Sequence, residues 1–333
     1  MNHDRTRLHR RNEDASFDLA FIDMTSSIMK RLTGVFPMEK EAEVRHFKRD
    51  FLWLCVLSVV FAPALLRAED SAVSIRLWGG MTYLLAQDVN DGNKGRNDLI
   101  ISAAALSGWS ASGNTNPIRT GNEFGGDLII PFTPRIGIGF GAGYVQGTKG
   151  SDIAFSKGSS GLTMTSTPDI AAIPLRAGLF LNLPLGEKAC FTANAGAAYY
   201  LSKYSYEWKM EGAGYWDDVD RIAYEVSANG LGFHGGIGLE FDLAANLVLF
   251  IEGQGRHAKI GGFSGTIEKH YKEGWTYSGE GNLYAYDLKY GASTLKQLDV
   301  REAEPSGSSV SNVREANVDF SGLYAVAGIK IRF

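Results

Sequence analysis

The sequence predicts an all-β fold in which eight antiparallel strands run up and down and close into a barrel. Three observations in the 333-residue chain predict it. Apolar residues recur at every second position in eight separate stretches, which is the period of a strand whose two faces meet different surroundings. The connections between the stretches alternate between tight turns and long polar segments. The last stretch ends on Phe333, with no polar tail after it.

Composition agrees with strands rather than helices. The chain has 40 Gly but only 9 Pro, together with 14 Tyr and 18 Phe. Glycine destabilises helix interiors, whereas aromatic side chains suit pleated surfaces. We therefore expect many strands separated by glycine-rich turns.

Each of the eight stretches keeps its apolar side chains on one parity. In chain order these side chains are Val73, Ile75, Leu77, Met81 and Tyr83; Phe124, Leu128, Ile130 and Phe132; Ile136, Ile138, Phe140, Ala142 and Tyr144; Ile173, Leu175, Ala177, Leu179, Leu181 and Leu183; Phe191, Ala193, Ala195, Ala197, Tyr199 and Leu201; Leu231, Phe233, Ile237, Leu239 and Phe241; Leu247, Leu249 and Ile251; and Leu323, Ala325, Ala327, Ile329, Ile331 and Phe333. The charged residues of these stretches fall on the opposite parity.

The length of the stretches indicates a membrane. Soluble strands usually run about five or six residues, whereas a tilted membrane-spanning strand needs about 9 to 11. Tight turns are expected near 133–135, 184–188 and 242–246, and long polar connections over 87–119, 149–167, 203–223 and 261–316. Short periplasmic turns, long extracellular loops and an even strand count are typical of bacterial outer-membrane barrels. The sequence thus predicts a transmembrane barrel domain over 69–333.

An export signal precedes this domain. Residues 51–66 read FLWLCVLSVVFAPALL, with Lys48 and Arg49 before the run and the small residue Ala68 after it. The uncharged run is too short for a transmembrane helix, which needs about 20 residues, and its flanks are those of a signal peptide. We expect a signal peptide over 46–68 with cleavage after Ala68; the Ala62-Pro63-Ala64 triplet is the alternative site. Residues 1–45 are expected to be a mis-assigned translation start or a disordered extension, with Met38 as the other possible start.

The exported part carries few further signals of its own. Cys190 is its one cysteine, so no internal disulfide is expected. Beyond residue 68 there are 22 Lys and Arg against 28 Asp and Glu. This acidic balance gives no reason to expect nucleic acid as a partner.

A closed barrel accounts for the apolar C-terminus of the chain. The final strand pairs with the first, so a terminal Phe lies in the periplasmic aromatic girdle instead of fraying in water. The ending Gly328-Ile329-x-Ile331-x-Phe333 resembles the signal by which outer-membrane proteins are recognised by their assembly machinery. From Ser71 onward the chain resembles the OmpA-like, OmpX/OmpW-type family of small barrels, although its loops are longer than usual for that family. The resemblance implies location in the bacterial outer membrane, with lipids and the assembly machinery as partners.

A soluble lipocalin-type barrel is the main alternative fold. Its apolar side chains face inward around a ligand. Here charged residues, six of them singled out below, lie on the parity opposite to the apolar one, and a lipocalin would leave the continuous Leu, Ile and Phe face in water. The membrane barrel is therefore favoured.

These six charges are the candidate functional site. They are Arg76, Glu123, Asp127, Arg176, Glu252 and Arg256. Charges inside an eight-stranded barrel are held in a narrow space with little water, where they must be paired. We expect an ionic network that closes the lumen, and the alternative is a gated pore for small solutes in which the pairs rearrange.

No enzyme is predicted, and no cofactor or metal. His234 and His257 lack the His-x-Ser spacing of the outer-membrane deacylases, so structural histidines are expected. The stretch DVNDGNKG, from Asp88, resembles a calcium loop, but Leu99 stands where the twelfth-position Glu belongs. Acidic residues in the first and third long connections are expected to be ordinary solvated loop residues; they are Asp88, Asp91, Asp98, Asp217, Asp218 and Asp220.

The fourth long connection is rich in aromatic residues. It contains YKEGWTYSGEGNLYAYDLKY, which starts at Tyr271. We expect an extracellular hairpin there. Exposed Tyr and Trp also suit recognition of sugars or proteins, so a surface binding protein that acts through its first and fourth loops is a third possible function beside the closed barrel and the narrow channel.

Overall fold

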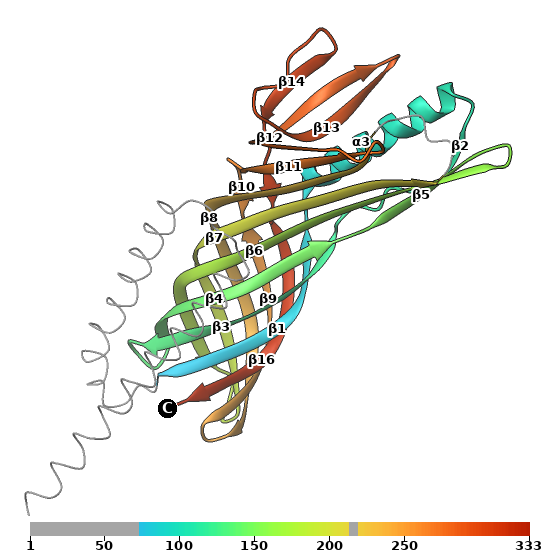
Figure 1. Ribbon diagram of the computed structural model, residues 1–333. Helices are drawn as coiled ribbons and strands as arrows, with labels where there is room; N and C mark the ends of the chain where they lie inside the picture. The colour runs from blue at the N-terminus through green and yellow to red at the C-terminus, as the bar shows by residue number, and fades with distance from the viewer. Residues whose placement is uncertain (1–72, 213–218) are drawn as a thin grey trace, which may run out of the picture. The chain divides into compact units, whose positions relative to one another are not determined.

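The computed structural model describes residues 73–212 and 219–333 (Figure 1). The described residues all belong to one compact unit, 70–333. The expected signal peptide over 46–68, its cleavage after Ala68 and the segment 1–45 therefore lie outside the described residues. The described part contains sixteen strands and the helix α3.

Eight of these strands pair with one another in a closed ring. They are β1 (Ser74–Leu84), β3 (Thr120–Pro131), β4 (Ile136–Thr148), β6 (Ser160–Pro184), β7 (Ala189–Gly212), β8 (Val219–Ala244), β9 (Leu247–His257) and β16 (Gly322–Arg332). Each pairs antiparallel with the next one along this order. The last strand, β16, returns to the first, with Ile331 opposite Ile75. The expected antiparallel β-structure is confirmed, but the described residues contain sixteen strands instead of the eight expected, because the long connections also form strands.

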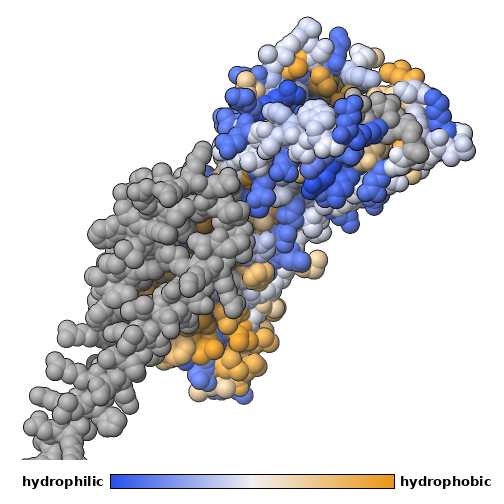
Figure 2. Space-filling view, viewed as in Figure 1, coloured by the Kyte–Doolittle hydropathy of each residue, from blue (hydrophilic) through white to orange (hydrophobic). Residues whose placement is uncertain are grey.

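The two faces of the ring differ as the parity predicts. Large apolar side chains on the outward parity are exposed on all eight strands, for example Leu231 at 70 %, Leu323 at 68 % and Met81 at 64 %. The charged residues of the other parity are buried inside. Figure 2 shows hydrophobic residues gathered at one end of the visible face and hydrophilic residues at the other. A lipocalin-type arrangement, with apolar side chains inside, is not the one found.

The tight turns of the ring lie at the end where the chain terminates (Figure 1). The β3–β4 turn is closed by the amide of Phe132, which donates to the carbonyl of Ile136 at 2.8 Å, and the β6–β7 turn by Leu185, which donates to Ala189 at 2.8 Å. The terminal amide of Phe333 donates to the carbonyl of Val73 at 2.9 Å, which ties the chain end to the first strand. Tight turns are thus present at the positions expected between β3 and β4 and between β6 and β7.

Two of the expected loops are in fact strand. The strands β6, β7 and β8 have 25, 24 and 26 residues, so they continue far beyond the stretches predicted for them. β5 (Ser151–Lys157) pairs back onto the first part of β6. The expectation of long polar loops over 149–167 and 203–223 was therefore wrong for most of both ranges, because these extensions bury one face on other elements instead of meeting water on both.

The first long connection holds α3 (Gln87–Leu106), a helix that the sequence did not suggest. Its two glycines and three asparagines are poor helix formers, which is why the segment looked like a loop. The glycines are explained by packing. A Cβ at Gly92 would collide with Leu298, and one at Gly95 with the backbone of Lys296, so only glycine lets the helix approach the neighbouring strand this closely.

Seven more strands lie in the long connections. They are β2 (Ser110–Gly113), β10 (Lys259–Ile260), β11 (Ser264–Tyr271), β12 (Thr276–Tyr290), β13 (Ser293–Arg301), β14 (Val310–Glu315) and β15 (Val318–Asp319). β11 and β12 form the expected hairpin, with Lys269 opposite Tyr277. We call α3, these seven strands, β5 and the extensions of β6–β8 the outer lobe.

The outer lobe and the adjoining parts of the ring strands share one hydrophobic core, which also includes Leu84 of β1 and Val145 of β4. One continuous cluster of buried residues includes Tyr204 and Trp208 of β7, Val89 of α3 and Leu298 of β13. The helix thus packs between extended ring strands and the strands of the fourth long connection (Figure 1). No helix in the described ranges is long and apolar enough to cross a membrane.

Candidate functional site: the charged lumen

The six predicted charged residues all lie on the inner side of the ring and are buried. Their exposed fractions run from 2 % for Arg76 and Glu123 to 9 % for Asp127. An ionised group costs several kcal/mol to bury unless it is paired and hydrogen-bonded. Each of these buried charges therefore needs an oppositely charged partner and further hydrogen bonds.

The structure places the six residues in three ion pairs. Arg76 meets Glu252 at 2.6 Å, Arg176 meets Asp127 at 2.8 Å and Arg256 meets Glu123 at 2.6 Å. None of these pairs joins neighbouring strands of the ring. The paired side chains extend across the lumen, so each ion pair links two strands that share no backbone hydrogen bonds.

Each guanidinium also lies against an aromatic ring. Arg76 lies 3.8 Å from the ring centre of Phe250 and Arg176 lies 4.4 Å from that of Trp78, while Arg256 lies 5.1 Å from that of Tyr324. A cation over an aromatic face is stabilised by about 0.5 to 2 kcal/mol, more when water is absent. The aromatic rings therefore hold the cations and also occupy space in the lumen.

Neutral side chains complete the network around the carboxylates. The indole nitrogen of Trp78 donates to Asp127 at 3.0 Å. Asn194 donates to Glu252 at 2.8 Å, and Gln254 also donates to Glu252. Both of these acidic groups thus accept from a cation and from an uncharged donor, the combination that a buried charge requires.

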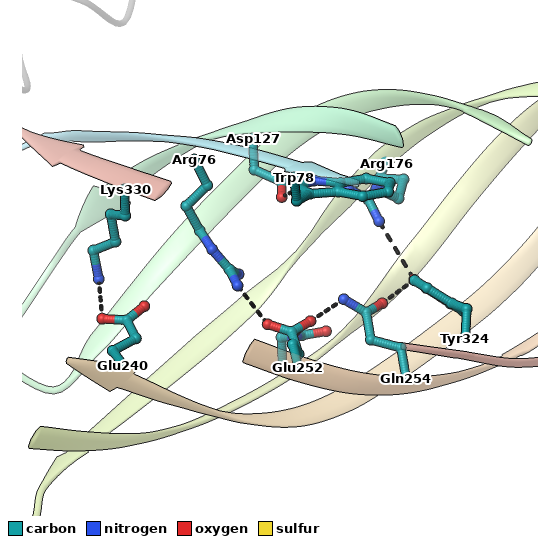
Figure 3. Close-up of polar contacts among 10 residues, drawn as sticks. Arg76, Trp78, Asp127, Arg176, Glu240, Glu252, Gln254, Tyr324 and Lys330 are labelled. Carbon is teal, nitrogen blue, oxygen red and sulfur yellow. Dashed lines mark hydrogen bonds and ion pairs between the residues drawn. The ribbon is translucent and has the colours of Figure 1, made fainter. Parts of the chain in front are cut away.

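The network crosses the lumen from wall to wall. Nη1 of Arg176 on β6 lies 3.4 Å from the hydroxyl of Tyr324 on β16, and the same hydroxyl donates to Gln254 (Figure 3). β6 and β16 are four strands apart in either direction around the ring of eight. These side chains therefore connect opposite walls.

A row of glycines on β4 makes room for these side chains. A Cβ at Gly139 would collide with the ring of Phe180, and one at Gly141 with the carboxylate of Asp127. Any other residue at either position would compete with a lumen-filling side chain for the same space. The glycines on the inward parity of β4 thus leave the space that these lumen side chains occupy.

A fourth ion pair lies in the lumen outside the predicted set. Lys330 meets Glu240 at 2.6 Å, and both side chains are less than 10 % exposed (Figure 3). Both residues stand on the inward parity of their strands. From their inward parity, both residues could have been predicted to belong to the network.

Another buried charge cluster lies in the outer lobe and was not predicted. Arg96 of α3 pairs with Asp299 of β13, and the hydroxyls of Tyr224 and Tyr286 each donate to Asp299 at 2.6 Å. Burial alone would raise the pKa of Asp299, but Arg96 and the two hydroxyls hold it below its ordinary value. Because these residues come from distant parts of the chain, no sequence spacing could reveal them.

The residues of the expected C-terminal signal end the last strand. Gly328, Ile329 and Ile331 lie in β16, and Phe333 follows it directly with its side chain 72 % exposed. Gly328 is required for packing, since a Cβ there would collide with the carbonyl of Leu77 on β1. The outward Ile329 lies in the exposed apolar band.

The acidic residues of the first and third long connections are dispersed. Asp88, Asp91 and Asp98 lie on α3, each in an ion pair, so their expected role as ordinary loop residues was wrong. Asp220 lies in β8 and not in a loop. Asp217 and Asp218 lie outside the described residues.

The remaining candidates are His234, His257 and Cys190, and Nδ1 of His257 lies 3.4 Å from the hydroxyl of Ser321. His234 and His257 share no contact with an acidic side chain within hydrogen-bonding distance in the described part, and Cys190 is a free thiol there. The described residues hold no His, Cys, Asp and Glu group that could bind a metal ion.

Comparison with known proteins finds distant structural similarity. No family model matches the sequence, and no curated protein matches it. The fold is similar to that of a major outer membrane protein from Thermus thermophilus, with 13 % identity over 79 % of this chain and 100 % of that chain, at a TM-score of 0.34. It is also similar to the outer membrane protease OmpT from Escherichia coli, with 8 % identity over 80 % of this chain and 98 % of that chain, at a TM-score of 0.29.

Proposed function

We propose that the protein is a non-enzymatic barrel of the bacterial outer membrane, of the small OmpA-like, OmpX/OmpW type, whose lumen is sealed by its inward ionic network. The contact between Arg176 and Tyr324 is the observation that best supports a sealed lumen, because it joins opposite walls of the ring. A sealed lumen makes the barrel a structural element that anchors the outer lobe at the cell surface.

The outward surface supports the membrane location. Apolar side chains that are more than one-third exposed occur on every strand of the ring. Soluble proteins rarely expose contiguous apolar patches above a few hundred Å², whereas a closed ring with an apolar band satisfies its backbone within the bilayer. Outer-membrane lipids are the partners of this band, and the assembly machinery is the proposed partner of β16.

Solubility tests the membrane location. Refolded protein is expected to need detergent to stay in solution and to run with heat-modifiable mobility in gels, because a folded barrel resists unfolding by detergent until it is heated. Protein that remains monomeric and folded in buffer without detergent would contradict this location.

A narrow channel for small solutes is the second candidate. One observation favours it: several buried polar atoms on the inner parity have no hydrogen-bond partner among the described residues, namely Asn194 Oδ1, Ser202 Oγ and His234 Nδ1. Buried polar atoms of this kind are the usual positions of ordered water. Swelling of liposomes that contain the protein, in solutions of small sugars and amino acids, separates the two candidates, since a sealed barrel gives no swelling above that of empty liposomes.

A further inference from the structure

A polar pocket lies in the outer lobe, far along the chain from the lumen network. It has a volume of about 230 Å³ and is lined by residues of α3, β12, β13 and β14. This is smaller than the roughly 300 to 1,000 Å³ of pockets for drug-sized ligands. The pocket lies between the first and fourth long connections, and it has room for a single small ring.

Charged groups of both signs line the pocket. Both guanidinium nitrogens Nη1 and Nη2 of Arg314 donate to Asp88 at 2.6 Å, and Lys296 donates to Asp91 at 2.9 Å. The side chain of Asn312 donates to Asp287 at 2.7 Å. The wall therefore carries hydrogen-bond donors and acceptors in contact with one another.

The pocket groups keep free hydrogen-bonding capacity. Lys296 has three ammonium donors and each carboxylate has about four acceptor positions, so the contacts above leave several of both. The side chains of Lys296, Arg314 and Asp91 are 60 %, 50 % and 37 % exposed. A ligand in the pocket can reach these groups without breaking an ion pair.

The backbone around the pocket is shaped to present these groups. The register between β12 and β14 shifts between Ala285 and Asp287, and such bulges re-aim side chains. Asn312 has a φ of 51°, a conformation that asparagine tolerates better than most residues. These two irregularities direct Asp287 and its amide partner to the same wall.

The charge balance limits the class of ligand. Three carboxylates face two cations, so the pocket is net negative by one and disfavours an anion. No metal-binding group of His, Cys, Asp and Glu occurs in the described part of the chain. The polar wall offers little to an apolar ligand. Neighbouring donors and acceptors match adjacent hydroxyl groups, each of which both donates and accepts.

We infer that this pocket binds a neutral sugar ring, as one unit of a glycan outside the cell. The inference rests on the proposed function only for the lobe's extracellular location. The binding itself depends on the lobe alone, so conduction by the barrel would overturn the sealed lumen and leave the sugar site unaffected.

Titration of the refolded full chain in detergent micelles tests the site. The probes are the methyl glycosides of glucose, galactose and mannose, with calorimetry or saturation-transfer NMR as the readout. We expect saturable binding of at least one glycoside. Asp287→Asn and Asp91→Asn each remove an acceptor charge with little change of shape, and each is expected to weaken that binding by about tenfold.

The control is Asp98→Asn, on the same helix but outside the pocket. Asp98 pairs with Lys94 on an exposed face, so this variant is expected to bind the glycoside as the unaltered protein does. Heat-modifiable mobility confirms that each variant is folded. Absence of saturable binding by all three glycosides would overturn the inference, as would equal binding by all three variants.

Discussion

Arg176 and Tyr324 stand on opposite walls of the ring, yet their side chains lie 3.4 Å apart. Tyr324 also donates to Gln254, which donates to Glu252. A continuous chain of side chains therefore crosses the lumen at this height. The lumen resembles a core in which charged groups replace apolar ones, and its stability depends on every charge keeping its partner.

Loss of one member of a buried pair should be costly. In the variant Arg176→Ala, Asp127 keeps the indole of Trp78 but loses its cation. Removal of one partner of a buried ion pair typically costs about 3 to 5 kcal/mol. We expect a decrease of that size in the free energy of unfolding, measured by urea titration of the protein in micelles. Arg135→Ala, at an exposed turn, is the control and should change it by less than about 0.5 kcal/mol.

The paired replacement should cost less than the single one. Arg176→Met together with Asp127→Leu removes both charges and keeps apolar volume in the lumen, an exchange that is often neutral for buried pairs. The double variant is therefore expected to unfold at higher urea than Arg176→Ala. A double variant less stable than Arg176→Ala would show that the ion pair itself, and not the unpaired charge, dominates.

Gly95→Ala should destabilise the outer lobe. In an exposed helix this change stabilises by about 1 kcal/mol. Here the added Cβ would collide with the backbone of Lys296, so we expect the sign to reverse and limited proteolysis to cut within 87–119 faster. The exposed Lys94→Ala serves as the control. Slower cleavage of Gly95→Ala would mean that the helix does not pack against β13.

The outer lobe should lose stability in acid. Asp299 has a lowered pKa in the folded protein because Arg96, Tyr224 and Tyr286 outweigh the effect of its burial. Its contribution is fully present above its unfolded pKa of about 3.9 and is lost as the pH falls below that value through the folded pKa. We expect the urea midpoint of the lobe, followed by tryptophan fluorescence, to fall between about pH 6 and about pH 3.

The variant Asp299→Asn isolates this contribution. It should lower the midpoint at the higher pH and show a smaller change between the two pH values. An unchanged pH dependence in this variant would assign the acid sensitivity to other carboxylates.

The ring strands could be predicted from the sequence because successive residues on each strand alternate between two different environments. An apolar outer face and a narrow, charged inner space impose a period of two on every strand, so Leu77 and Arg76 reveal their faces by parity alone. The same parity carried the six lumen charges. The pairing of individual charges, however, depends on strand tilt and on how far each side chain extends. The periodicity of the sequence indicates neither.

The outer lobe could not be predicted in the same way. Its core is surrounded by water on many sides, and its helix uses Gly92 and Gly95 where helix propensity is unfavourable. Contacts such as Arg96 with Asp299 join segments 203 residues apart in the chain. Tertiary packing here overrides local sequence preference.

Deletion of Phe333 should reduce assembly in cells more than stability in vitro. The terminal amide is bonded to Val73, but the aromatic side chain is 72 % exposed on the protein, so its loss removes few internal contacts. If the C-terminus is an assembly signal, we expect several-fold less heat-modifiable protein in the outer membrane and normal refolding in micelles. Wild-type amounts in the membrane would refute the signal, and failure of refolding alone would indicate a packing role.

Planar-bilayer recording on the refolded, unaltered protein tests the sealed lumen most directly. The account predicts no steady unitary conductance, because the contact between Arg176 and Tyr324 joins opposite walls and the surrounding charges are paired. The combined variant Arg176→Ala and Tyr324→Ala shortens both side chains and is expected to conduct if it folds, which checks that the protein has inserted. Steady unitary conductance of the unaltered protein would contradict the account.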